Sequence, residues 1–241
     1  MTDLASHPLL WRGKQVVHRI QALASGHARL DEALPGNGWP LGAVTELISA
    51  TPGCGELSLL LPLLARLSQQ DHWISMVDPP WIPYPPALHA RGVALEKLQL
   101  IRTQSRGESL WACEQVVHGI SGGALLAWPD SLSFSELRKL QLAAKSTQKT
   151  VFLFRGQDAA NAPSPAALRL QLGPVDGDLQ IRVLKCRGQR PASAIRIRRS
   201  QLLQGSVSPA AGSGTPDQHP GSPSANPVTP LPDSRANHPG F

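Results

Sequence analysis

Residues 42–67 constrain the fold of this chain more than any other stretch. An apolar run at 44–48 leads through a glycine-rich sequence at 52–55 into a second apolar segment at 56–69. This order predicts a buried strand, a tight loop and a helix, which is the local architecture of a P-loop. In a P-loop, the N–H groups of the loop and of the helix N-terminus hold phosphate groups. We therefore expect a fold built around such a loop.

The residues that a P-loop needs for its chemistry are missing. The pattern G-x-x-x-x-G-K-[ST] can be placed over 50–57, where only Gly55 of its four fixed positions fits. Glu56 stands at the lysine position and would repel phosphates, and Leu57 stands at the hydroxyl position and cannot bind Mg²⁺. We predict a vestigial P-loop that binds no nucleotide cofactor and catalyses no reaction, formed by Gly53, Cys54, Gly55, Glu56 and Leu57. The alternative is an ATPase with a divergent loop.

Strand and helix patterns alternate through most of the chain. Expected strands lie at 44–48, 72–77, 98–101, 124–128 and 150–154, and expected helices lie at 56–69, 108–120 and 135–146, with Ser135 as the N-cap of the last. Such alternation predicts an α/β fold with a mostly parallel sheet. After residue 165, two alternating runs at 167–172 and 179–184 flank the turn sequence 176–178, which predicts a closing antiparallel hairpin.

Composition divides the chain into three parts. Residues 1–25 form an N-terminal arm with an amphipathic helix expected over 8–24, which either packs on the core or docks on a partner. Residues 26–203 form the α/β core. Residues 204–241 are rich in proline, serine and glycine, and we expect this tail to be disordered because it lacks apolar side chains.

Charge, cysteine content and the lengths of the apolar runs limit the cellular compartment and the kinds of site that we expect. The chain carries a formal net charge of +6 and three cysteines without a C-x-x-C pair, so neither a disulfide framework nor a metal site is expected. The start of the chain lacks the pattern of a signal peptide, and the longest apolar run, 57–65, is much shorter than the roughly 20 residues that span a bilayer. We expect a cytoplasmic protein without a membrane segment.

One segment is strongly basic. Residues 182–199 contain seven basic and no acidic residues: Arg182, Lys185, Arg187, Arg190, Arg196, Arg198 and Arg199. Such a run can bind phosphates without sequence specificity, by releasing counterions. The alternative is an ordinary solvated edge strand, in which basic side chains protect against aggregation. We predict that the run contacts nucleic acid, or a protein filament on nucleic acid.

Several motifs in this order resemble those of the RecA-like ATPase core: Leu30-Asp31, Leu34-Pro35-Gly36-Asn37-Gly38, Val44-Thr45-Glu46, Gly53-Cys54-Gly55 and Leu184-Lys185-Cys186-Arg187-Gly188. Others are similar to those of the ImuA group, which is associated with translesion DNA synthesis and distantly related to SulA-like proteins: Trp39-Pro40-Leu41-Gly42, Pro83-Tyr84-Pro85-Pro86-Ala87-Leu88, Leu110-Trp111-Ala112-Cys113-Glu114-Gln115 and Trp128-Pro129-Asp130. The resemblance covers roughly residues 10–200.

The resemblance implies a role beside DNA polymerases. It suggests a non-catalytic adaptor in SOS-induced mutagenesis, with an ImuB-like inactive Y-family polymerase homologue and an error-prone replicative-type polymerase as partners, and a RecA filament or DNA as a further contact. A SulA-like inhibitor of a tubulin-like division protein is the alternative. Glu46 aligns with a position where such folds can carry a catalytic glutamate, but without the loop lysine we predict a capping or salt-bridging role for it.

Overall fold

The structure is a computed structural model that describes residues 21–119, 122–186 and 194–204. The chain divides into a unit of residues Met1–Val207 and a second unit of Ser208–Phe241. The second unit lies outside the described residues, as do the first 20 residues, so the expectations for the tail and for most of the arm are not addressed by the structure.

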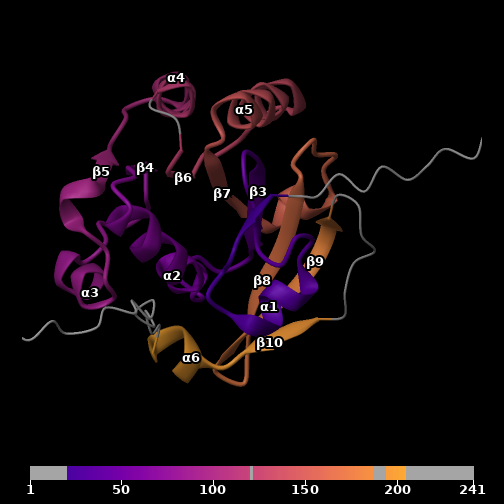
Figure 1. Ribbon diagram of the computed structural model, residues 1–241. Helices are drawn as coiled ribbons and strands as arrows, with labels where there is room; N and C mark the ends of the chain where they lie inside the picture. The colour runs from indigo at the N-terminus through magenta and orange to yellow at the C-terminus, as the bar shows by residue number, and fades with distance from the viewer. Residues whose placement is uncertain (1–20, 120–121, 187–193, 205–241) are drawn as a thin grey trace, which may run out of the picture. The chain divides into compact units, whose positions relative to one another are not determined.

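The described part is built on an eight-stranded sheet with the order β10-β9-β8-β3-β7-β6-β4-β5 (Figure 1). Its strands are β3 (Val44–Ser49), β4 (Ile74–Val77), β5 (Leu98–Ile101), β6 (Ala124–Ala127), β7 (Thr150–Gly156), β8 (Leu168–Val175), β9 (Asp178–Cys186) and β10 (Ile195–Ile197). The strands from β8 to β5 run parallel, whereas β9 and β10 are antiparallel to their neighbours. The predicted α/β fold with a closing hairpin is confirmed.

Helices cover both faces of this sheet: α1 (Ala28–Ala33), α2 (Glu56–Gln69), α3 (Pro85–Ala90), α4 (Arg106–His118), α5 (Phe134–Thr147) and α6 (Arg199–Gln204). Successive strand residues point to opposite faces. In β6, Leu126 therefore packs in the core on the α2 side, whereas Leu125 packs in the core under α4 and α5 (Figure 1). Both faces are thus buried, as a parallel sheet requires.

Two predictions of local structure are wrong. The helix expected over 8–24 does not extend to its end, because Ala22–Leu23 form strand β1, which pairs with β2 (Trp39–Pro40). The remaining residues of that helix up to 20 lie outside the described part of the chain. The N-cap of α5 is Ser133 instead of Ser135, because a capping box joins the side chains of Ser133 and Glu136 to each other's backbone N–H groups.

This capping box predicts a dependence of stability on pH. Hydrogen bonds from Ser133, and then the Arg106 guanidinium, lower the pKa of Glu136 from 4.5 to about 2. A lowered carboxyl pKa contributes stability above the unfolded value, and this contribution is lost as the pH falls from 4.5 towards about 2. In Glu136→Gln, we therefore expect the melting temperature to fall less on acidification than in the wild type. An equal fall of the melting temperature in the variant and the wild type on acidification would contradict this.

Within the described residues, we find no helix whose length and hydropathy would allow it to span a bilayer.

Candidate functional site

The loop that the sequence predicts as a vestigial P-loop connects β3 to α2. Gly53 and Gly55 have φ angles of 84° and 114°, which side chains other than glycine rarely adopt, and Gly55 is the N-cap of α2. Helix α2 begins at Glu56, as the sequence predicts. The loop therefore directs two N–H groups, those of Gly53 and Gly55, to the start of a 14-residue helix.

The carboxylate of Glu56 occupies the inside of this loop. Its Oε1 accepts a hydrogen bond from Gly53 N at 2.6 Å, and its Oε2 accepts one from Gly55 N at 3.0 Å. The residue is only 8% exposed. Glu56 thus does more than repel a phosphate: its own anionic group binds the N–H groups that a phosphate would need, and it also complements the positive end of the α2 dipole.

The loop also borders a cavity whose walls are mostly apolar. Leu57 and Ser58 line a cavity of about 260 Å³ together with Gly53, Gly55, Glu56, Pro79, Pro80, Trp81, Pro83 and Trp128. Cys54 is half-buried with its Sγ 3.4 Å from Ser49 Oγ, and burial raises the pKa of its thiol. A site for phosphate or Mg²⁺ would need cationic and oxygen groups at this place, whereas this chain supplies proline and aromatic side chains.

A second cavity, of about 350 Å³, lies along the same edge of the sheet and shares Trp128 with the first. Asp78 at its base follows β4 and accepts hydrogen bonds from Thr103 N at 2.8 Å and Thr103 Oγ1 at 2.7 Å. Partial burial would raise the pKa of Asp78, but the hydrogen bonds from Thr103 and Ser109 outweigh it and lower the pKa. Asp130, which follows β6 after Trp128 and Pro129, is exposed and also lines this cavity.

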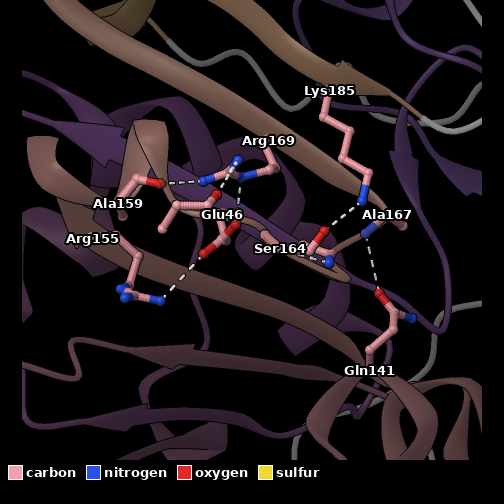
Figure 2. A network of polar contacts seen from close by, with 10 residues as sticks. Glu46, Gln141, Arg155, Ala159, Ser164, Ala167, Arg169 and Lys185 are labelled. Carbon is pink, nitrogen blue, oxygen red and sulfur yellow. Dashed lines mark hydrogen bonds and ion pairs between the residues drawn. The ribbon is translucent and has the colours of Figure 1, made fainter. Parts of the chain in front are cut away.

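Glu46 has the salt-bridging role predicted for it (Figure 2). It is 1% exposed in the middle of β3, where its Oε2 accepts from Arg169 Nε at 2.6 Å and its Oε1 accepts from Arg155 Nη1 at 3.2 Å. Arg169 lies directly opposite on β8 and also donates to the carbonyl groups of Ala159 and Ala162. The network joins three strands to the segment before β8, so both oxygens of Glu46 are engaged in holding the fold.

The basic run is distributed among different environments. Arg196 forms ion pairs with Asp176 and Asp178 of the β8–β9 turn, at 3.1 and 2.8 Å. The Lys185 ammonium donates to the carbonyl oxygen of Ser164 at 2.6 Å (Figure 2). Arg182, Arg198 and Arg199 are exposed, and Arg187 and Arg190 lie outside the described residues. The structure therefore brings part of the run to the surface and gives two of its members structural contacts.

Sequence reasoning missed an exposed aromatic surface. Trp81, Ile82 and Tyr84, in the segment between β4 and α3, are 62%, 70% and 70% exposed. The sequence suggested the core or its rim for Trp81, Trp111 and Trp128, and Trp111 is also 63% exposed, whereas Trp128 is half-buried and stacks on Phe154 with ring centroids 4.1 Å apart. Pro79, Pro80 and Pro83 were the available signal, since they disfavour a regular element that could bury the apolar side chains beside them.

Among the residues that the structure describes, no three or more His, Cys, Asp or Glu side chains gather in a group that could hold a metal ion. The ion-pair network of Glu46 and the hydrogen bonds of Asp78 bring polar groups together, and these groups have partners within the chain.

Together, these features define an α/β protein of RecA-like type whose P-loop is closed by its own carboxylate. No model of a protein family matches the chain. The chain is 32% identical to the cell division inhibitor SulA of Edwardsiella piscicida over 114 residues, which are 46% of this chain and 68% of that relative. The chain therefore belongs to the SulA family.

Proposed function

We propose that this chain is a non-catalytic protein of the SOS response to DNA damage, which stops cell division by binding a tubulin-like division protein. The observation that carries the proposal is the similarity to a cell division inhibitor. The closed P-loop supports it, because Glu56 holds the N–H groups of Gly53 and Gly55. A fold with an occupied phosphate site can still act as a rigid surface for another protein.

The test is to produce the full chain in its host without DNA damage. We expect cells that grow without dividing, and the purified chain should reduce the GTP-dependent assembly of the purified division protein in a sedimentation assay. Dividing cells and undisturbed assembly would contradict the proposal. The same cells should be scored for mutation frequency, because this separates inhibition of division from the second candidate.

The second candidate is the adaptor of a mutagenic polymerase complex, with an ImuB-like polymerase homologue and an error-prone replicative-type polymerase as partners. The similarity to SulA leaves more than half of this chain unmatched, and the ImuA-like motifs extend over most of the core. The exposed Arg182, Arg198 and Arg199 give such an adaptor a surface for DNA or for a filament on DNA.

The adaptor makes a separate prediction for these three arginines. If they contact phosphates, DNA binding should weaken steeply with salt, and Arg182→Ala, Arg198→Ala and Arg199→Ala together should reduce the slope of log K against log salt by about one unit per lost contact. Arg196→Ala serves as the matched control, because Asp176 and Asp178 already neutralise that side chain. An unchanged slope in the triple variant would show that these arginines are exposed to water and do not contact phosphates.

A further inference from the structure

We propose that the partner protein docks on the aromatic loop surface, which we define as Trp81, Ile82 and Tyr84 with the 260 Å³ cavity beside the P-loop. The occupant is a segment of the division protein with apolar side chains beside acidic ones. This inference rests on the proposed function, since it assigns the surface through which that function acts. The surface uses the place where a P-loop protein would hold its nucleotide.

The loop that carries these side chains is stiff. Five of the eight residues from 79 to 86 are proline, and each proline fixes its own φ angle near −65°. Three large apolar side chains therefore stand in solvent on a backbone that loses little freedom when a partner binds. Preorganised surfaces of this kind bind more tightly for the same contact area, and Trp and Tyr are enriched among the few residues that dominate the binding energy of protein interfaces.

The cavity extends this surface into the fold. The Trp81 ring lies 3.8 Å from the point where a Cβ of Gly53 would be, and Leu202 of α6 lies 3.4 Å from that point at Gly55. The P-loop is thus enclosed between the aromatic loop and α6. Ligands of parallel α/β folds bind outside the carboxyl ends of the strands, and here the walls at that edge are largely apolar. An apolar side chain of the partner fits this cavity better than a phosphate does.

Charge around the surface indicates an acidic partner. Arg102 follows β5 at the same edge of the sheet, and Arg198 precedes α6, and both side chains are exposed. Of the acidic residues that line the two cavities, Glu56 is bound by the loop and Asp78 is bound by Thr103, whereas Asp130 is exposed. The whole chain is also basic, with a net charge of +6. A segment with acidic residues flanking its apolar side chains complements this arrangement.

The first test measures the affinity of the purified full chain for the purified tubulin-like division protein. Trp81→Ala should weaken binding about 30-fold or more, as expected for a central aromatic anchor. Trp111→Ala is the matched control, because it removes the same side chain at 63% exposure from α4, on the opposite face of the sheet. We expect this control to bind as the wild type does. Both variants should keep the wild-type melting temperature, since both side chains are exposed.

The second test compares two variants that place opposite charges at the same position. Ile82→Asp and Ile82→Lys are equally disruptive to apolar contact, so an acidic segment should bind the lysine variant about tenfold more tightly than the aspartate variant. Equal affinities of the two Ile82 variants would contradict an acidic partner segment. Wild-type affinity in a folded Trp81→Ala variant would show that the partner does not dock on the aromatic loop surface. In either case, inhibition of assembly by the wild-type protein would still support the proposed function. If the wild type itself does not bind, the proposed function and this inference both fail.

Discussion

Replacing Glu46 by alanine should lower the free energy of unfolding by about 3–5 kcal/mol, the cost of breaking a buried ion pair from one side. Arg169 is nearly as buried as Glu46, and Arg155 is only partly exposed, so the variant leaves two cations without their anionic partner inside the sheet. The Arg169 side chain would retain only its carbonyl partners, Ala159 and Ala162. Urea denaturation followed by circular dichroism measures the difference.

The matched control is Arg196→Ala, which removes two ion pairs at the surface of β10. Exposed ion pairs contribute roughly 0–1 kcal/mol because water screens them, so this variant should unfold close to the wild-type midpoint. A loss of less than about 1 kcal/mol in Glu46→Ala would contradict the structural role of the network, since a buried charge cannot be abandoned at so small a cost.

The role of Glu46 was predictable from the sequence, but its partners were not. The missing loop lysine was enough to argue against catalysis and for a salt bridge. The partners were not predictable, because Arg169 meets Glu46 only through the parallel pairing of β3 with β8, 123 residues apart in the chain. Strand register depends on tertiary packing, and a one-residue shift would turn the arginine to the other face.

The fold itself followed from local pattern. The strands β3 to β7 and helix α2 appear where apolar periodicity predicts them, because each must bury a continuous face. The failures lie at Ala22–Leu23 and Ser133. At the first, pairing with Trp39–Pro40 overrides the helical pattern of residues 8–24. At the second, two serines two residues apart compete for one cap, and only the position of Glu136 three residues after Ser133 decides between them.

The candidate site was half predictable. Glu56 in the lysine position predicted a loop without nucleotide, but only repulsion of phosphate could be argued from the residue type. In the structure, the carboxylate is also bound by the loop itself. The aromatic surface was missed because the exposure of Trp81 depends on the path of the chain between β4 and α3, and proline-rich segments carry no periodicity from which a face can be read. The positions of glycine, proline and charged residues predicted where the loops lie, but they did not predict which loop side chains are exposed or what those side chains contact.

We expect purified wild-type protein to bind ATP·Mg²⁺ with a dissociation constant of about 1 mM or weaker, the range of nonspecific contacts, and to release no phosphate. The structure gives the reason: a phosphate would have to displace the Glu56 carboxylate from Gly53 N and Gly55 N without a cation to compensate. Isothermal titration and a phosphate-release assay, with an active P-loop ATPase measured in parallel, provide the comparison.

The decisive variant is Glu56→Ala, which frees both N–H groups. Its affinity should stay near the millimolar range, because the lysine and hydroxyl groups that neutralise phosphate and hold Mg²⁺ are still absent. Its free energy of unfolding should fall by about 2 kcal/mol, as two backbone groups lose a charged acceptor. Micromolar binding or phosphate release by the wild type that disappears in this variant would instead make Glu56 part of a working site, and the chain a divergent ATPase.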